Sequence, residues 1–431
     1  MRLELNVINI KKAKFAKKTS IKKGILSVNM EELKRLLRED TRLGEINIEL
    51  ANPGEKCRIA RVIDAVEPRA KVGSDATDFP GAVGPQGTVG QGSTCVLRGA
   101  AVLTSEAFPV SGPPGIRAVG GLVDMWGPGA EVGQYGKTCN LVIMPSPSAG
   151  TSLPEYQVAL KIAGLKAAVY LARAGVDLDP DSVEVYDLPS LPQAARNSKG
   201  LPRVAYIMQL FSNQFLALPD DPIFYGDNLE RLLPTIVHPN EVIDGAIVAP
   251  CRNMGYDTYT VQNHPMVLEL YRNHGKNLYF AGVIVNNAPN NGPTINRTAN
   301  IAANLTKWTL GADGAVLTKT GGGAPNITLA ETASRCEELG VRTVIIIPSA
   351  GGDATALTLK VSTLFNDVPG VDAMISEGGG SAAGPNLNLP ASERVIGMDS
   401  SPLGGAMVRP AAQIKGTSDQ IGRSSLKIVQ Y

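Results

Sequence analysis

Residues 314–348, GAVLTKTGGGAPNITLAETASRCEELGVRTVIIIP, contain the pattern that decides the fold class of this chain. GAVLTK and VRTVIIIP are short apolar runs bounded by turn residues, which is typical of buried strands. LAETASRCEELG, between them, has the apolar spacing of an amphipathic helix and ends at a glycine. A strand, a helix and a second strand in this order predict a parallel βαβ unit.

The same alternation continues over much of the C-terminal half. VEVYDL, RVAYIMQL and LYFAGVIV are predicted strands, and VLELYRNH and NIAANLTKWTL are predicted helices. GAIVAP, residues 245–250, is predicted to be a further buried strand. We therefore expect an α/β fold with a doubly wound, mostly parallel sheet region from about residue 180 to the end of the chain.

Residues 1–150 have a different sequence pattern. INIEL, CRIARVIDAV, GLVDMW and NLVIM are short runs separated by glycine and proline, which predicts an irregular β-rich N-terminal domain. Asn29 followed by Glu32 predicts the start of one short helix. Seven lysines between Lys11 and Lys23 alternate with apolar residues, which favours a solvated hairpin face over a nucleic-acid-binding arm.

A long helix is predicted after this domain, over PEYQVALKIAGLKAAVYLARA at residues 154–174. The predicted domains are 1–150, then a first α/β lobe at 151–250 and a second at 251–431. The length of 431 residues, 43% of them hydrophobic, is enough for this number of domains.

The charge balance argues against partners recruited by a global electric field. The chain has 41 basic and 40 acidic residues, so neither nucleic acid nor an anionic membrane is an expected partner. The opening MRLELNVINIKKAKFAKK has no apolar signal segment, and no later run is long enough to span a bilayer. We predict a cytoplasmic protein without a membrane partner.

Neither a metal nor a nucleotide is expected as a cofactor. The five cysteines are widely spaced without a C-x-x-C pair, and there are only three histidines. The glycine-rich residues 90–99 and 320–326 lack the spacing of a phosphate-binding loop. Residues 376–385, SEGGGSAAGP, follow a predicted strand around Met374 and are either an anion-binding loop or a plain one.

Cys251 is the cysteine with a candidate chemical role, whereas the other four lie in or beside predicted strands and helices as packing residues. It follows the predicted strand 246–249, at the end where α/β sheets bind ligands. With Arg252 as a neighbouring cation, its thiol is a possible nucleophile. Alternatively, the thiol attacks the preceding carbonyl, the thioester eliminates, and the new chain begins with a pyruvoyl group, an electrophile that forms a Schiff base with an amine. The residues alone leave these two fates and a buried packing role open.

Long collinear stretches resemble one known family. They are MRLELNVINIKKAKF, NPGEKCRIARVIDAVEPRAKV, FPGAVGPQGTVGQGSTCVLRGAAVLTS, ALKIAGLKAAVYLARAGVDLDPDSVEVYD, LPRVAYI and LLPTIVHPNEVIDGAIV. Over nearly its whole length the chain resembles the precursor of the large subunits of component B of glycine reductase. This family is shared with sarcosine and betaine reductases and is more distantly related to the D-proline reductase precursor.

The resemblance implies a specific activity. In this family the precursor is cut at an internal cysteine that becomes a pyruvoyl group, and Cys251 stands in the matching region after DGAIV. The family reductively cleaves the C–N bond of a small amino acid. Its protein partners are a selenocysteine-containing subunit of component B and the selenoprotein component A.

Five residues near Cys251 complete the candidate site: Arg252, Tyr256, Asp257, Tyr259 and His264. Pro250 precedes the cysteine where the family typically has a small polar residue, which keeps two alternatives open. One is an uncleaved relative that uses the Cys251 thiol on another small carboxylate. The other is a non-catalytic assembly subunit for a selenoprotein partner. Glycine, sarcosine and betaine differ only in their N-methyl groups, and all three stay open as substrates.

Overall fold

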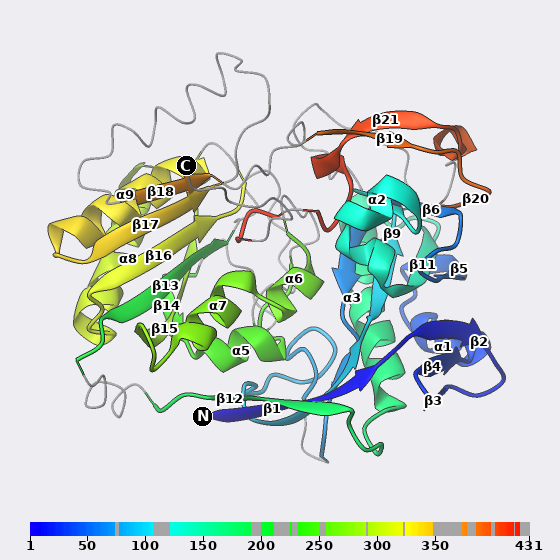
Figure 1. Ribbon diagram of the computed structural model, residues 1–431, viewed down its shortest axis with the longest axis horizontal. Helices are drawn as coiled ribbons and strands as arrows, with labels where there is room; N and C mark the ends of the chain where they lie inside the picture. The colour runs from blue at the N-terminus through cyan, green and yellow to red at the C-terminus, as the bar shows by residue number, and fades with distance from the viewer. Residues whose placement is uncertain are drawn as a thin grey trace.

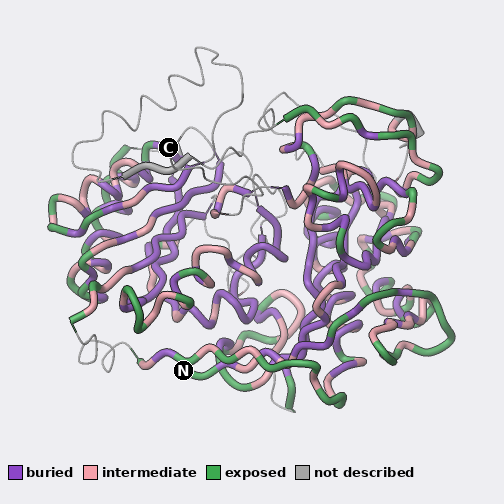
Figure 2. Tube along the Cα trace, in the orientation of Figure 1, coloured by how far each residue is buried: buried purple, intermediate pink, exposed green. Residues whose placement is uncertain are grey.

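The computed structural model describes residues 1–73, 77–106, 121–190, 200–210, 225, 232–249, 256–289, 292–321, 324–347, 373–376, 385–397, 401–417 and 419–422. It is a mixed α/β structure, as the sequence predicts, and within the described residues the strands form five sheets. Figure 1 shows a β-rich half, built mainly from the N-terminal residues, beside an α/β half that contains the mostly parallel sheet. Figure 2 shows that buried residues follow the central strands of both halves.

The β-rich half is centred on a six-stranded sheet with the order β10-β6-β9-β11-β5, in which β20 also pairs with β6. Its strands are β5 (Leu43–Ala51), β6 (Cys57–Val66), β9 (Ala100–Ser105), β10 (Gly121–Asp124), β11 (Cys139–Pro147) and β20 (Arg394–Ile396). The predicted strands of residues 46–50, 57–66 and 140–144 all lie within them. β20 pairs in parallel with β6, so this C-terminal strand returns to the β-rich half. The expectation that the α/β region continues to the chain end is wrong for β20, because its backbone hydrogen bonds are made with β6.

Helix α3 (Leu153–Arg173) packs against the β-rich half and confirms the predicted helix at 154–174. Ser152 and Glu155 form a reciprocal cap at its start, which satisfies two backbone N–H groups that have no partner within the helix. The apolar face of α3, including Leu160 and Leu171, belongs to the same buried cluster as Ile143 of β11. The domain boundaries at 150 and 250 stay predictions.

Two smaller sheets adjoin this half. One has the order β12-β1-β8-β7, with β1 (Arg2–Asn9), β7 (Arg69–Lys71), β8 (Gly92–Arg98) and β12 (Ser182–Asp187). The other has the order β2-β4-β3, with β2 (Lys12–Phe15), β3 (Ser20–Lys22) and β4 (Ile25–Val28). β3 and β4 form an antiparallel hairpin, and the lysines between residues 11 and 23 are all exposed, which confirms the predicted solvated face. Helix α1 (Met30–Leu37) follows, capped by Asn29 as predicted.

Helix α2 and two C-terminal strands also belong to the β-rich half. Helix α2 (Gly127–Val132) follows β10, and the C-terminal strands β19 (Asn386–Leu389) and β21 (Met407–Pro410) pair with each other. α2 packs against β19, so these C-terminal strands also lie on the β-rich half (Figure 1).

The α/β half contains a six-stranded sheet with the order β14-β15-β13-β16-β17-β18. β13 (Arg203–Leu210), β15 (Tyr279–Asn287), β16 (Gly314–Lys319), β17 (Arg342–Ile347) and β18 (Ala373–Ser376) are parallel, and β14 (Thr235–Val237) is antiparallel. β12, which the sequence placed in this region, is a strand as predicted but pairs with β1 instead.

Helices pack on both faces of this sheet (Figure 1). Ala205 and Ile207 of β13 belong to a buried cluster with residues of α8 (Gly292–Asn304) and α9 (Ala324–Glu338). Tyr206 and Met208, which point the opposite way, belong to a cluster with residues of α5 (Pro239–Asp244) and α7 (Pro265–Asn273). Apolar residues on both faces explain why these strands have continuous apolar sequences.

Within the described residues, the predicted strand at 246–249 does not form an extended strand of a sheet. Helix α5 ends at Asp244 and is capped by Gly245, whose φ of +100° favours glycine. Ile247 then makes a single β-bridge, and residues 246, 248 and 249 have no regular secondary structure. All four are buried, Val248 in the cluster of the β-rich half and the other three in that of the α/β half. The segment is apolar because it fills the space between the two halves. A run buried on all sides has the same sequence pattern whether or not its backbone pairs in a sheet.

Candidate functional site

Cys251 and Arg252 lie outside the described residues, and the described residues nearest to them are Ala249 and Tyr256. The backbone N–H of Ala249 donates a hydrogen bond to Thr258 Oγ1 at 3.1 Å. Thr258 is the first residue of helix α6 (Thr258–Gln262). The two ends of the segment that carries Cys251 are therefore joined by a buried hydrogen bond.

A buried ion pair holds this junction. Asp64 of β6 accepts hydrogen bonds from Thr258, from its backbone N–H at 2.9 Å and from Oγ1 at 2.9 Å. Lys161 Nζ, from the middle of α3, lies 2.6 Å from Asp64 Oδ2 and 3.2 Å from Thr258 Oγ1. Both charged side chains are at most 4% exposed. We call Asp64, Lys161 and Thr258 the clamp, because they tie α3, β6 and α6 together directly beside Ala249.

Asp257 stabilises the start of α6. It is the N-cap residue, and its Oδ1 accepts hydrogen bonds from the N–H and the hydroxyl of Thr260, each at 2.8 Å. Its Oδ2 lies 3.6 Å from Nζ of Lys415, in the C-terminal part of the chain. Asp257 is therefore a capping residue that also contacts the C-terminal segment.

The other described candidate residues are buried in two different environments. Tyr256 belongs to the apolar cluster of the α/β half. Tyr259 packs edge-on against Tyr135 of the β-rich half, with ring centroids 5.6 Å apart. His264 precedes α7, and its Nε2 lies 3.2 Å from the hydroxyl of Tyr206, which also hydrogen-bonds Thr318. The structure places these residues on both sides of the junction between the halves.

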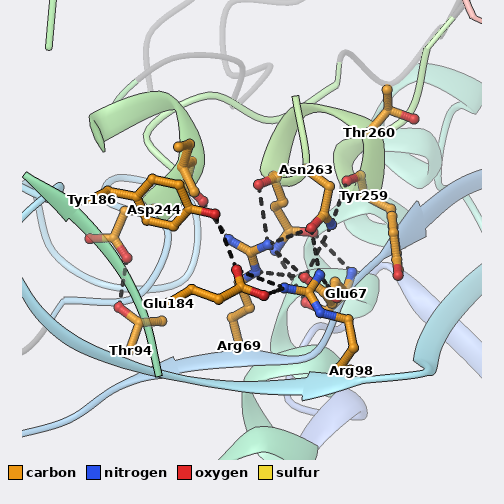
Figure 3. Close-up of polar contacts among 12 residues, drawn as sticks. Glu67, Arg69, Thr94, Arg98, Glu184, Tyr186, Asp244, Tyr259, Thr260 and Asn263 are labelled. Carbon is orange, nitrogen blue, oxygen red and sulfur yellow. Dashed lines mark hydrogen bonds and ion pairs between the residues drawn. The ribbon is translucent and has the colours of Figure 1, made fainter. Parts of the chain in front are cut away.

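A second buried polar network lies beyond α6 (Figure 3). Glu67 is fully buried, and its carboxylate accepts hydrogen bonds from Arg69 at 2.6 Å, Arg98 at 2.8 Å and Asn263 at 3.1 Å. Burial acts to raise the pKa of Glu67, but Arg69, Arg98 and these hydrogen bonds outweigh it and hold the pKa below its usual value. Glu67 is therefore an ionised carboxylate that joins β7 and β8 to the end of α6.

A cavity of about 410 Å³ opens beside this network, and its charged lining includes Arg69, Arg98, Glu184 and Arg272. Arg98 pairs with Glu67 and Glu184, and Arg272 pairs with Glu269. The guanidinium groups in the cavity wall thus have carboxylate partners from the chain itself.

Asp244, at the end of α5, anchors the segment that leads to residues 246–249. Its carboxylate accepts hydrogen bonds from Lys71 Nζ at 2.6 Å, Thr94 Oγ1 at 2.7 Å and the backbone N–H of Gly90 at 2.7 Å. Buried carboxylates therefore anchor the chain on both sides of Cys251. Asp244 lies before it in the sequence, and Asp64 binds Thr258, which lies after it.

The described cysteines have the structural role that the sequence predicts. Cys57, Cys95, Cys139 and Cys336 are buried free thiols. Burial raises the pKa of Cys57, Cys95 and Cys139 to about 11 and that of Cys336 to about 12. These thiols stay protonated near neutral pH and are poor nucleophiles.

The described part of the chain has no cluster of three His, Cys, Asp or Glu side chains arranged to bind a metal. None of its helices is long and apolar enough to cross a membrane.

Sequence reasoning missed the clamp. Lys161 stands among the apolar residues of α3, and Asp64 stands inside the run CRIARVIDAV. A charged residue on an otherwise apolar face is seldom buried without a partner, and this was the available signal.

The fold and these contacts define a mixed α/β protein in which buried ion pairs hold the described residues on either side of Cys251. The family described as glycine/sarcosine/betaine reductase component B subunits matches residues 1–407. The chain belongs to this family of reductase-complex subunits.

Individual relatives agree with this assignment. The sarcosine reductase complex component B subunit alpha of Peptoclostridium acidaminophilum is 36% identical, over 92% of this chain and 90% of its own length. The glycine reductase complex component B subunits alpha and beta of Acetoanaerobium sticklandii are 35% identical, over 92% and 89%. The betaine reductase complex component B subunit alpha of P. acidaminophilum is 34% identical, over 80% and 77%. No solved structure matches the chain.

Proposed function

We propose that the chain is the precursor of the substrate-binding subunits of component B in a complex that reductively cleaves the C–N bond of glycine or an N-methylated relative. The observation that carries this proposal is the match of the component B family to residues 1–407. The relative from A. sticklandii is named for two subunits, alpha and beta, and this chain aligns with 89% of it. One sequence that supplies two subunits agrees with cleavage inside the chain.

Cys251 is the proposed cleavage site. Its Sγ attacks the carbonyl carbon of Pro250, and the peptide C–N bond breaks to leave a thioester and a free amine. Loss of the Cα proton and cleavage of the Cβ–S bond release residues 1–250 as a thiocarboxylate. The dehydroalanine left at position 251 becomes an imine, and water replaces its nitrogen, which leaves as ammonia. The product is a pyruvoyl group, whose carbonyl supplies an electrophile for an amino group.

The clamp supports this chemistry by positioning. Thr258 receives the hydrogen bond of the Ala249 N–H, two residues before Cys251, and Asp64 and Lys161 hold Thr258 in place. A cleavage reaction within one chain depends on bringing the thiol and the carbonyl together, so fixed ends on the segment favour it. Asp64, Lys161 and Thr258 are therefore positioning residues in this proposal.

Two protein partners follow from the same proposal. The chain contains no selenocysteine, so a selenocysteine-containing subunit of component B and the selenoprotein component A would supply the selenium chemistry. The four buried free thiols fit a reducing compartment, and we place the complex in the cytoplasm.

The test is the intact mass of the denatured protein, expressed alone and with its genomic neighbours, followed by labelling with a hydrazide. We expect fragments 1–250 and 251–431, of which the second reacts with hydrazide. Cys251→Ala should abolish both results, and Cys95→Ala, a buried cysteine on β8, should leave both unchanged. A single unreactive species in both preparations would refute cleavage.

One observation favours a second candidate, an uncleaved relative that uses the Cys251 thiol on another small carboxylate. Pro250 precedes Cys251 and replaces the small polar residue expected at this position. In this case the complex turns over with an intact chain and loses all turnover on Cys251→Ala. A non-catalytic assembly subunit would instead keep turnover in the assembled Cys251→Ala complex.

A further inference from the structure

The carboxyl ends of β13 and β16 lie side by side at the point where the sheet changes direction. The chain passes from β13 to β15 on one side, and β16 then pairs with the other side of β13. In open α/β sheets this switch point forms a crevice in which ligands bind. Helix α9, 15 residues long, begins just after β16 and brings its positive end to the same place.

Three buried side-chain oxygens at this point have no hydrogen-bond partner. They are Gln209 Oε1 near the end of β13, Thr320 Oγ1 just after β16 and Asn326 Oδ1 in the first turn of α9. Gln209 and Thr320 are 0% exposed and Asn326 is 4% exposed. An unpaired buried polar atom costs about 1–3 kcal/mol, so three near the carboxyl ends of β13 and β16 favour a ligand that pairs with them.

Two hydrogen bonds connect the segments that carry these three residues. The backbone N–H of Thr320 donates to the carbonyl of Gln209 at 3.2 Å. Gln209 Nε2 donates to the carbonyl of Pro325, the residue before Asn326, at 2.7 Å. A carbonyl accepts only, so this bond fixes the orientation of the Gln209 amide and leaves its oxygen as the free atom.

Positive charge adjoins the free oxygens. Lys319, the last residue of β16, is 4% exposed, and its Nζ donates to the carbonyl of Gly321 at 2.5 Å. Lys319 and the start of α9 favour an anionic group, whereas Gln209 Oε1 and Asn326 Oδ1 accept N–H donors. A small zwitterion that carries both an ammonium and a carboxylate satisfies both demands.

The C-terminal segment contacts both this end of the sheet and the described residues beside Cys251. Lys415 lies 3.6 Å from Asp257, near the start of α6. Further along, Gln420 Oε1 accepts a hydrogen bond from the N–H of Gly321 at 2.7 Å. Lys415 therefore contacts the described flank of Cys251, and Gln420 contacts the backbone just after β16.

We propose that Gln209, Thr320 and Asn326 bind the amino group of an amino acid that carries at least one N–H, with its carboxylate toward Lys319 and the start of α9. This inference rests on the proposed function and adds the residues that recognise the substrate. Glycine and the monomethylated sarcosine have N–H groups as ammonium ions. Betaine has none, so it leaves the three oxygens unpaired and binds more weakly.

The test is equilibrium binding of glycine, sarcosine, betaine and acetate to the full chain co-expressed with its genomic neighbours, measured by calorimetry. We expect glycine or sarcosine to bind at least tenfold more tightly than betaine and acetate, which is the effect of about one unmade hydrogen bond to a charged donor. Thr320→Val should weaken binding of the preferred amino acid about tenfold. The same variant should not lower the urea midpoint of the ligand-free protein, because the hydroxyl of Thr320 makes no hydrogen bond that the substitution would remove.

Tyr279→Phe is the matched control. The Tyr279 hydroxyl is also buried without a partner, but it lies at the amino end of β15, the opposite end of the same sheet. It should leave binding unchanged. Equal affinities for glycine and betaine, or unchanged binding in Thr320→Val, would overturn the inference. Hydrazide-reactive fragments with unchanged binding in Thr320→Val would refute only this site, and selective binding to an uncleaved chain would refute only the cleavage.

Discussion

Replacement of Lys161 by methionine is the sharpest test of the clamp. The change keeps the length and apolar stem of the side chain but leaves Asp64, which is 3% exposed, without its cation. Removal of one partner from a buried ion pair costs about 3–5 kcal/mol. Two hydrogen bonds from Thr258 to Asp64 remain, so we expect a loss near the lower limit, about 3 kcal/mol.

The assay is urea unfolding, with Lys166→Met as the matched control on the same helix. Lys166 lies 3.5 Å from Glu39 on the surface, with the two side chains 26% and 62% exposed, so its loss should cost less than about 1 kcal/mol. The double variant Asp64→Asn/Lys161→Met should recover part of the loss, because no unpaired charge remains buried. If Lys161→Met costs no more than Lys166→Met, the ion pair does not stabilise the junction and our reasoning is wrong.

Two further predictions concern buried titratable groups. Glu67→Gln should cost about 3–5 kcal/mol in urea unfolding because it leaves the buried guanidinium group of Arg69 without its carboxylate and Arg98 with only Glu184, whereas Glu184→Gln, at a 40% exposed side chain, should cost less than about 1 kcal/mol. Burial lowers the pKa of His238 from 6.5 to about 4, so the unfolded chain binds a proton that the folded chain does not, and stability falls as the pH drops below about 6.5. His238→Asn keeps a capping acceptor for α5 and should remove about 1–2 kcal/mol of this loss between pH 7 and pH 5; an unchanged pH dependence in the variant would contradict the assignment.

Most of the secondary structure was predictable because its causes are local. β6, β13 and β16 lie where short apolar runs end in turn residues, and α3 lies where apolar spacing and a capping sequence coincide. The failure at residues 246–249 has a physical reason as well. A segment buried between two halves has apolar side chains on every side, as a central strand does. Only backbone hydrogen bonds to neighbouring strands distinguish the two, and these depend on the tertiary structure.

The candidate site was predictable only in part. The resemblance pointed to Cys251, and the family is confirmed by the match over residues 1–407. The residues closest to it in sequence were an incomplete guide, because Asp257 is a helix cap and Tyr259 packs against Tyr135. The polar residues that hold its flanks come from distant elements, and neither Asp64 nor Lys161 was a sequence candidate.

The sequence by itself determined the mixed α/β class, most strands and helices, the buried thiols and the family, since propensity, periodicity and collinear similarity are properties of the chain alone. The tertiary structure decided which charges meet. Lys161 and Asp64 are 97 positions apart, Thr258 and Asp64 are 194 apart, and the oxygens around the end of β16 come from β13, the residue after β16 and α9. Such contacts depend on how the two halves and the sheet order bring remote residues together. These contacts are needed because the polar groups are buried. A polar group removed from water requires a hydrogen-bond or ion-pair partner, which the fold or a ligand supplies.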